Sequence, residues 1–423
     1  MKALLITYYW PPAGGSGVQR WLKFVKYLPE FGIEPVVYTV KDANYAITDA
    51  SLTEEVSPKV KVIKEPIWEP NDLLTKLGNQ EKQVSAGFLS SKPSFVGRQI
   101  QYIRANYFIP DARKYWIKPS VKRLLNYMAK QSIDVVVTSG PPHSLHLIGK
   151  ELKEKTGVKW IADFRDPWTN IDYFHALPMT KKSKNKHYKL ENEVLKKADA
   201  IVVVGASMKK EFDDRNKNVH IITNGFDGKI ASGQDKLDKK FSISHIGMMN
   251  ADRNPLILWG VLKELIVESP DFAKDLQVKL IGQCDKSVFD SIQSEGLTES
   301  VNFISYLPHK EVMNYQKMSQ ILLLSVNKVP SARSIITGKV FEYLQSNRPI
   351  LAIGPLDGDL ADIINDSGSG IMIDFEDAKG LKEYIQACYK KFKSNKLKVR
   401  SEHIDRYHRR NLTEKLAGLI KTV

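Results

Sequence analysis

The sequence of 423 residues contains only two cysteines and no long apolar run. Two cysteines, Cys284 and Cys388, exclude a disulfide framework and are typical of a protein in a reducing compartment. No apolar stretch approaches the roughly 18 to 20 residues of a membrane-spanning helix. A strand-like segment at 3–7 begins almost at the first residue, so we expect no signal peptide. These features predict a cytoplasmic protein.

Acidic residues are scarce in one part of the chain, and this makes the net charge of +15 uneven. Residues 92–130 contain one acid, Asp111, and nine basic residues: Lys92, Arg98, Arg104, Arg113, Lys114, Lys118, Lys122, Arg123 and Lys130. Aromatic residues alternate with them: Phe95, Tyr102, Tyr107, Phe108, Tyr115, Trp116 and Tyr127. A second basic cluster occupies 181–189.

Two interpretations of this basic region stay open. The bases can be solvated helical faces whose aromatic residues pack underneath, or they can form a surface for an anionic partner. Such a partner would be a phosphate-rich substrate, nucleic acid or the anionic inner face of the plasma membrane. Since we find no nucleic-acid recognition motif, we expect no nucleic-acid partner.

What the chain does contain is an alternation of strand-like and helix-like segments. Continuous apolar runs of this length are typical of strands buried on both faces, and helical crossovers between them predict parallel, doubly wound α/β sheets. The first series of runs lies at 3–7, 34–40, 134–139, 159–164 and 200–205. The second series lies at 241–247, 277–282, 301–305, 321–326, 349–354 and 370–374.

The two series predict two Rossmann-like domains that face a central cleft. The first domain is expected at 1–227 and the second at 241–398, with a glycine-rich, weakly apolar linker at 228–240. A helical segment at 399–423 follows and is expected to pack back on the first domain. Ligands of such sheets bind at the carboxyl ends of the strands.

A glycine-rich loop, "YYWPPAGGSG", follows the first predicted strand. Gly15 and Gly17 would let the backbone approach a ligand, and free N–H groups at the start of the next helix attract anions. A dinucleotide fingerprint is an alternative, because Asp42 follows the second strand, but Arg20 stands where the third glycine belongs. A purely structural turn is the other alternative.

Two further loops place polar side chains after buried strands. His143 lies in "TSGPPHS", and Asp163, Arg165 and Asp166 lie in "ADFRDPW". Charged groups at such positions need partners or a ligand. We expect His143 and Asp166 to be catalytic residues, with a local ion network of Arg165 and Asp166 as the structural alternative.

In the second half, Gly338 and Lys339 open a helix, and Glu342 follows on the same face. A lysine can meet a phosphate, and a carboxylate can accept hydrogen bonds from two ribose hydroxyls. A surface ion pair between Lys339 and Glu342 is the alternative. The sequence contains no cluster of histidine, cysteine and aspartate residues of the kind that binds a metal, so we expect no metal site.

Taken in order, several motifs resemble those of retaining glycosyltransferases of the family 4 type, over essentially the whole chain. They are "YYWPPAGGSGVQR", "FIPDARKYW", "SGPPHS", "ADFRDPW", "HIGMMNADRNP", "YLPHKEV" and "GKVFEYLQSNRPILAIGP". The resemblance implies the GT-B fold. It also implies transfer of a sugar from a nucleotide-diphosphate donor to an acceptor hydroxyl with retention, without a metal or other cofactor. The bacterial surface-glycan and polysaccharide members are the most similar, so a glycan or lipid-linked acceptor is expected.

The resemblance also assigns roles by position. The donor would contact Gly15, Gly17, Gly247, Arg253, His309, Gly338, Lys339 and Glu342. The acceptor side would include Arg113, Lys114 and Arg165. The chain departs from the family at Ser334, where a glutamate is usual, and at Met248, where a basic residue is usual. A non-catalytic nucleotide-sugar-binding protein and an NAD-dependent oxidoreductase stay open as alternatives.

Overall fold

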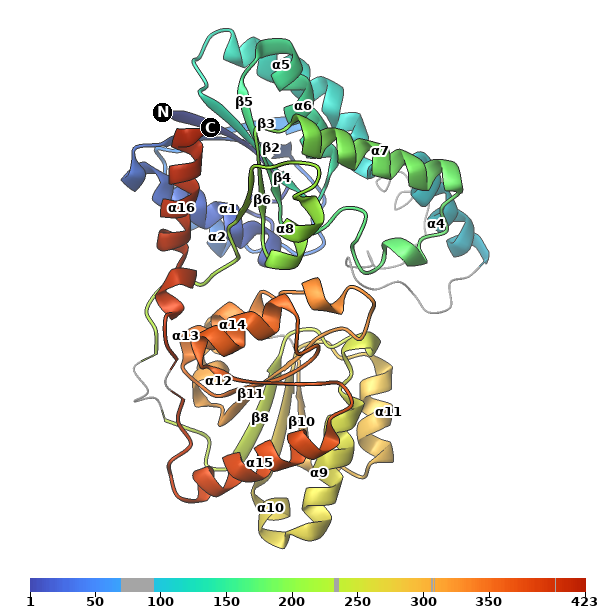
Figure 1. Ribbon diagram of the computed structural model, residues 1–423, viewed down its shortest axis with the longest axis vertical. Coiled ribbons are helices and arrows are strands. Elements are labelled where there is room, and N and C mark those ends of the chain that lie inside the picture. Colours follow the sequence, from blue (N-terminus) through green and yellow to red (C-terminus); the bar gives the residue numbers. More distant parts are fainter. Residues whose placement is uncertain (70–94, 232–235, 306, 308, 400) are drawn as a thin grey trace. The chain divides into compact units, whose positions relative to one another are not determined.

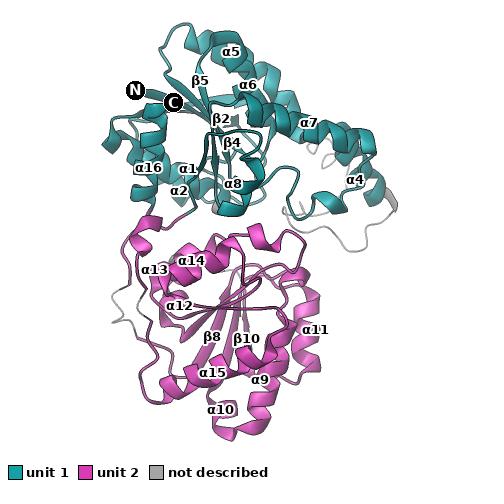
Figure 2. Ribbon diagram, viewed as in Figure 1, with its two compact units in different colours: residues 1–224, 409–423 teal, residues 225–408 magenta. Residues whose placement is uncertain are grey.

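The computed structural model describes residues 1–69, 95–231, 236–305, 307, 309–399 and 401–423. They divide into two compact units, one formed by 1–224 with 409–423 and the other by 225–408 (Figure 2). Each unit is a parallel sheet between helices (Figure 1), as the apolar runs predict, so the expected α/β class with two doubly wound domains is confirmed.

The first unit contains a seven-stranded sheet in the order β3-β2-β1-β4-β5-β6-β7. All of its neighbouring strands pair in parallel. The strands are β1 Lys2–Ile6, β2 Glu34–Lys41, β3 Lys61–Pro66, β4 Val135–Gly140, β5 Lys159–Phe164, β6 Ala200–Val203 and β7 Val219–Ile221. The strand order reverses between β1 and β4, which is where sheets of this kind bind ligands at their carboxyl edge.

Side chains of the central strands enter two separate cores. Leu4 and Ile6 of β1 pack with α5, α6, α7 and α8, whereas Ala3 and Leu5 pack with α1 and α16. This two-sided burial explains why the strand reads as one continuous apolar run. The helices are α1 Ser16–Tyr27, α2 Ser51–Glu54, α4 Phe95–Tyr107, α5 Ile117–Met128, α6 Ser144–Thr156, α7 Lys181–Lys197, α8 Ala206–Phe212 and α16 Arg409–Thr422, with 3-10 helices η1 Leu28–Phe31, η2 Ala112–Trp116 and η3 Phe174–Ala176.

The second unit contains a six-stranded parallel sheet in the order β10-β9-β8-β11-β12-β13. Its order reverses between β8 and β11. The strands are β8 Phe241–Ile246, β9 Leu276–Ile281, β10 Val301–Ile304, β11 Ile321–Ser325, β12 Ile350–Ile353 and β13 Gly370–Ile373.

Two cores again cover the faces of this sheet. One includes residues of α9, α10, α11 and α15, and the other includes residues of α13 and α14. The helices are α9 Leu256–Glu268, α10 Pro270–Asp275, α11 Lys286–Ser294, α12 His309–Met318, α13 Lys339–Ser346, α14 Asp359–Ser367 and α15 Ala378–Lys393, with 3-10 helices η4 Ala251–Arg253, η5 Thr298–Ser300, η6 Ala332–Ser334 and η7 Ile404–Tyr407.

The limits of the two units differ slightly from the sequence-based boundaries. The first unit ends at Asn224 rather than at 227, and the described part of the expected linker groups with the second unit. The last helix, α16, returns to the first unit and packs on α1. There, Arg410 Nε donates to Glu30 at 2.7 Å. In the described part of the chain, no helix is long and apolar enough to cross a membrane.

Candidate active site

The loops at the carboxyl ends of β1, β4 and β5 bring the predicted residues of the first unit together. Gly15 caps α1 with φ +83°, a backbone conformation that favours glycine. His143 stands at the start of α6, after β4, and Arg165 directly follows β5. Because parallel strands end at the same edge, three segments far apart in the sequence meet at the switch point between β1 and β4.

Arg165 ties these loops to one another. Its Nη1 donates to the Gly17 carbonyl oxygen at 2.7 Å, and its Nη2 donates to the Pro141 carbonyl oxygen at 2.7 Å. The guanidinium also lies 5.4 Å from the ring centroid of Tyr9. A Cβ at Gly17 would lie 2.8 Å from Arg165 Nη1, so the absence of a side chain there makes room for the arginine. Arg165 therefore holds the glycine loop in place, which is a role that sequence reasoning did not assign to it.

Asp163 and Arg20 form a buried ion pair below these loops. Arg20 Nη2 donates to Asp163 Oδ1 at 2.8 Å and Nε donates to Oδ2 at 3.1 Å, with both side chains 1% exposed. Trp21 Nε1 and Ser139 Oγ also donate to Oδ2, at 2.7 and 2.9 Å. The residue that replaces the third glycine of a dinucleotide fingerprint is thus a structural arginine, and this argues against the dinucleotide alternative.

His143 is buried at this edge and packs flat on Trp168, with ring centroids 4.8 Å apart and planes 5° apart. Its Nδ1 has no hydrogen-bond partner among the described residues. Burial, His146 and Arg165 hold the pKa of His143 well below its usual value. The imidazole is therefore neutral at physiological pH and can accept or donate one hydrogen bond without carrying charge.

Asp166, the other predicted catalytic residue, is exposed in the same loop. Within the described part of the chain its carboxylate forms no ion pair with Arg165, whose Nη1 and Nη2 donate to backbone carbonyls instead. Desolvation raises the pKa of Asp166 and Arg165 acts in the opposite direction, so the two charges interact without a direct ion pair. The catalytic roles of His143 and Asp166 stay predictions.

The predicted acceptor-side bases are engaged within the first unit. Arg113 Nε lies 2.9 Å from Glu69 Oε1, and its Nη2 donates to the Tyr8 hydroxyl at 3.2 Å. Lys114 donates to the Tyr107 carbonyl oxygen and lies 4.9 Å from the ring centroid of Tyr115. Arg113 is thus part of an internal polar cluster, whereas Lys114 lies among exposed aromatic rings.

In the second unit, the loop after β8 contains Gly247 with φ +104°. A Cβ at Gly247 would lie 2.6 Å from Lys339 Cε and 3.0 Å from Lys339 Nζ. The glycine therefore lets Lys339, the first residue of α13, reach the end of β8. Gly338 caps this helix. Arg253 lies in η4 nearby, and its Nη1 donates to the Met248 carbonyl oxygen at 3.2 Å while its Nε donates to Asn327 at 2.9 Å.

Lys339 is surrounded by neutral acceptors. Its Nζ lies 3.0 Å from His245 Nε2 and 3.3 Å from the Met248 carbonyl oxygen. Among the residues that the structure describes, no carboxylate is within ion-pair distance of Lys339, and Gln316 rather than Lys339 contacts Glu342. Burial and Arg253 lower the pKa of Lys339 to about 7, and Glu342 and Cys284 act in the opposite direction.

Glu342 is held by a residue that the sequence did not reveal. Gln316 of α12 is buried and donates through Nε2 to Glu342 Oε2 at 2.9 Å. Ser334, at the position of the family's first glutamate, donates instead to the Ser331 carbonyl oxygen at 2.9 Å. His309 is the first residue of α12, and Pro308 of the same predicted loop lies outside the described residues.

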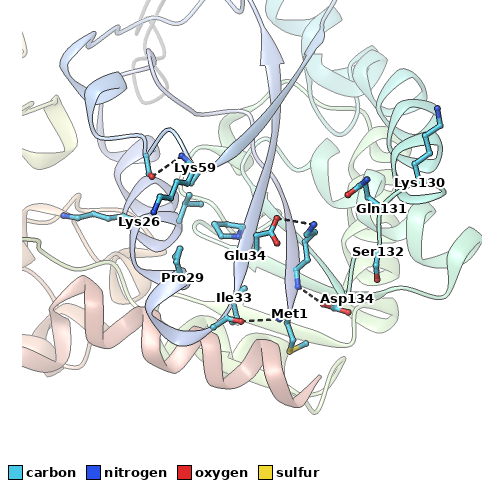
Figure 3. Close-up of a pocket in the computed structure, with 16 residues that line it drawn as sticks. Met1, Lys26, Pro29, Ile33, Glu34, Lys59, Lys130, Gln131, Ser132 and Asp134 are labelled. Carbon is cyan, nitrogen blue, oxygen red and sulfur yellow. Dashed lines mark hydrogen bonds and ion pairs between the residues drawn. The ribbon is translucent and has the colours of Figure 1, made fainter.

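A cavity of about 960 Å³ lies elsewhere, at the amino ends of β1 and β2 (Figure 3). Lys2 pairs with Glu34 across it at 3.2 Å, and the Lys2 backbone N–H donates to Asp134 at 2.6 Å. None of the predicted site residues lines it. Since α/β sheets bind ligands at the opposite edge, we place the candidate site at the strand-end loops. Within the described residues, no group of three or more His, Cys, Asp or Glu could hold a metal ion.

Comparisons with known proteins bear on the same regions. Residues 72–229 match the family model described as Glycosyltransferase Family 4, so the resemblance to that family is confirmed for this part of the chain. No curated protein matches.

Several solved structures share the fold of the whole chain. Sucrose-phosphate synthase from Thermosynechococcus elongatus matches at 14% identity and a TM-score of 0.61, covering 100% of this chain and 98% of that one. Anabaena HepE, solved with UDP-glucose, matches at 11% identity and a TM-score of 0.62, covering 100% of both chains. WaaG, a glycosyltransferase involved in lipopolysaccharide biosynthesis, matches at 12% identity and a TM-score of 0.57, also covering 100% of both. The fold is therefore GT-B.

Proposed function

Because residues 72–229 match glycosyltransferase family 4, we propose that this chain transfers a sugar from a nucleotide-diphosphate donor to an acceptor hydroxyl. We further propose retention at the anomeric carbon and a role in cell-surface glycan or polysaccharide synthesis. The observation that supports donor binding best is Lys339, a partly buried amine beside Arg253 that has neutral acceptors and no ion-pair partner within the described residues. Two cationic side chains that lie close together at the end of a strand favour the binding of an anion.

In this proposal Lys339 and Arg253 stabilise the pyrophosphate as it leaves. Charge develops on the leaving phosphate when the glycosidic bond to the donor breaks, and preorganised cations lower the energy of that transition state. Gly247 permits the lysine to approach, and the backbone N–H groups at the start of α13 add a favourable dipole. A metal ion is not needed for this role, because the side chains supply the positive charge.

The loops of the first unit would receive the acceptor and the transferred sugar. His143 is neutral, so its imidazole suits hydrogen bonding to an uncharged sugar hydroxyl. Arg165 keeps the glycine loop in position by holding the Gly17 carbonyl. We propose front-face attack, in which the leaving phosphate accepts the proton of the acceptor hydroxyl.

Thermal-shift screening tests the proposed donor. A ligand that binds only the native state, present at 100 times its Kd, stabilises by about 2.7 kcal/mol. We expect at least one of UDP-, GDP-, ADP- or dTDP-linked sugars to raise the Tm, and the matching nucleoside to have little effect. Absence of a shift with every nucleotide sugar would overturn the proposal. Release of nucleoside diphosphate during turnover separates an enzyme from a non-catalytic nucleotide-sugar binder, the alternative suggested by Ser334.

Glu342→Ala is expected to weaken nucleotide-sugar binding by about 1.5–3 kcal/mol, the range for hydrogen bonds to a charged group. The carboxylate would accept hydrogen bonds from the ribose, and Gln316 would orient it. Calorimetry should show a smaller loss with a 2′-deoxyribose ligand, and Gln316→Ala should give part of the effect. Glu383→Ala is the control, because this exposed glutamate lies on α15. Equal affinities for wild type and Glu342→Ala would refute the ribose assignment.

We also propose that the protein binds peripherally to an anionic membrane through a surface that we call the α4–α7 face. This face consists of exposed side chains of two helices: Tyr102, Ile103, Arg104 and Tyr107 on α4, and Lys181, Lys182 and Tyr188 on α7. Asn106 joins these helices: it donates to the Pro178 carbonyl oxygen at 2.8 Å and accepts from the Thr180 N–H at 2.8 Å. Aromatic rings and bases together suit a membrane interface. Trp116 does not contribute, because it is buried and stacks on Tyr38.

Charge reversal of this face is expected to abolish vesicle binding. Each Lys or Arg near an anionic surface contributes about 1 kcal/mol, so Arg104→Glu, Lys181→Glu and Lys182→Glu together should remove most of the affinity. Co-sedimentation with phosphatidylglycerol-containing vesicles measures this, and high salt should mimic the substitution. The control is Lys286→Glu with Lys379→Glu, which alters exposed lysines of the second unit. Similar sedimentation with neutral and anionic vesicles at low salt would contradict the proposal.

A further inference from the structure

His245 is a buried histidine at the end of β8 that no sequence pattern assigned a role. Its side chain contacts the loop that the proposed function gives to the donor pyrophosphate. Nδ1 lies 3.2 Å from the Leu323 carbonyl oxygen, and Nε2 lies 3.0 Å from Lys339 Nζ and 3.4 Å from the Met248 carbonyl oxygen. The residue is 1% exposed, so solvent does not compete for either nitrogen.

The shorter contact at each ring nitrogen assigns the tautomer of His245. A carbonyl oxygen can only accept, so Nδ1 carries the proton and donates to Leu323. Nε2 is then left with a lone pair and accepts a hydrogen bond from Lys339. A protonated imidazolium would place a second cation 3.0 Å from the lysine. Burial, together with Lys339 and Arg253, holds the pKa of His245 well below its usual value, so the ring stays neutral.

The groups that face Lys339 come from five parts of the second unit. His245 lies on β8, the Met248 carbonyl follows it, Arg253 lies in η4, Cys284 follows β9, and Glu342 stands one turn further along α13. Glu342 is the nearby carboxylate, and Gln316 holds one of its oxygens. Without a bound anion, the amine thus faces neutral acceptors, a cation, a thiol and one carboxylate that Gln316 already holds.

We propose that His245 is a positioning residue that holds the Lys339 amine at the Gly247 loop in the empty site, and that Lys339 takes up a proton from solvent when a nucleotide-sugar pyrophosphate binds. The inference rests on the proposed donor site. Phosphate oxygens replace water and neutral acceptors as partners of the amine, and they favour its charged form. His245 Nε2 can keep one N–H of the resulting ammonium while the other two donate to the pyrophosphate.

Proton uptake is measured by titration calorimetry of the full chain in two buffers, PIPES and Tris, whose ionisation enthalpies differ. The ligand is the tightest-binding of UDP-glucose, ADP-glucose and GDP-mannose. A pyrophosphate diester is used because it has no ionisation of its own near neutral pH. At pH 7.5 we expect uptake of about 0.75 proton, the neutral fraction of an amine whose pKa is about 7. Lys328→Met, which removes an ion-paired, exposed lysine of the same unit, should leave this number unchanged.

The protonation of Lys339 also makes the affinity for the nucleotide sugar depend on pH. Lys339 has a lowered pKa in the empty site and a higher one in the complex, so binding weakens as pH rises above about 7. The Kd should rise about fifteen-fold between pH 7 and pH 8.5 if the bound lysine stays charged. Lys339→Arg should bind with no proton uptake and a flat profile, because arginine stays protonated throughout.

Substitution of His245 separates positioning from a structural role. His245→Leu removes the acceptor without adding charge, so the midpoint of the affinity profile should move down by about one pH unit. His245→Gln offers an amide oxygen in place of Nε2 and should restore the wild-type midpoint. An unchanged midpoint in folded His245→Leu overturns the positioning role. Wild-type binding without proton uptake overturns the proton inference, and failure of all three nucleotide sugars to bind overturns the proposed donor site as well.

Discussion

Replacing Asp163 by alanine is expected to lower the free energy of unfolding of the first unit by about 3–5 kcal/mol, the cost of leaving one member of a buried ion pair alone. Arg20 would keep the carbonyl oxygens of Ile222 and Thr223 as acceptors but lose the charge that balances it. Trp21 Nε1 and Ser139 Oγ would lose their acceptor at the same time. Unpartnered polar groups in a dry interior are costly, so the losses add to one another.

Tryptophan fluorescence during urea unfolding measures this effect selectively. The first unit contains all the tryptophans except Trp259, so the signal reports mainly on that unit. Glu154→Ala is the matched control, because it removes an exposed pair with Lys197 and should cost less than about 1 kcal/mol. A double variant, Asp163→Leu with Arg20→Met, should be less destabilised than Asp163→Ala. A loss below 1 kcal/mol in Asp163→Ala would show that the pair does not stabilise the unit.

The central strands could be predicted because burial on both faces makes them continuous apolar runs. Each run in the sequence coincides with a strand, whereas β3 and β7 were missed. Both lie at an edge of the seven-stranded sheet. In β3, Lys61, Lys64 and Glu65 interrupt the apolar residues, and β7 is only three residues long. Most residues of β3 and β7 are partly or fully exposed, so the continuous apolar run that identifies a central strand is absent from these two strands.

The loops of the candidate site could be predicted for a related reason, since glycine, proline and charged residues follow buried strands. The residues that these loop side chains contact could not be predicted. Arg20 and Asp163 are 143 residues apart in the chain, and Arg165 reaches Gly17 across 148 residues. Gln316 lies in a mostly polar helix and His245 in an apolar strand, and neither gave a signal, because each has the same sequence pattern whether it supports a site or only packs. Such pairings depend on the fold and not on local spacing.

Replacing Lys339 by methionine is expected to weaken binding of a nucleotide sugar by about 2–5 kcal/mol at pH 6.5, the cost of truncating one member of a charge-paired contact. At that pH the amine is mostly protonated, because its pKa is about 7. Methionine keeps most of the side-chain length and its apolar packing but offers no charge and no donor. The parent nucleoside has no phosphate for Lys339 to contact, so its affinity should change little.

The comparison between the two ligands is what tests the role of Lys339. A variant that merely distorted the end of β8 would weaken nucleotide sugar and nucleoside alike, and that result would refute the pyrophosphate contact. The difference between wild type and Lys339→Met should also shrink at pH 8.5, where the wild-type lysine is largely neutral before binding and must be protonated at a cost. Lys328→Met serves as the control again, because its lysine pairs with Glu376 at 3.0 Å on the surface. Only the loss of a positive charge at the donor phosphates predicts an effect that depends on both the ligand and the pH.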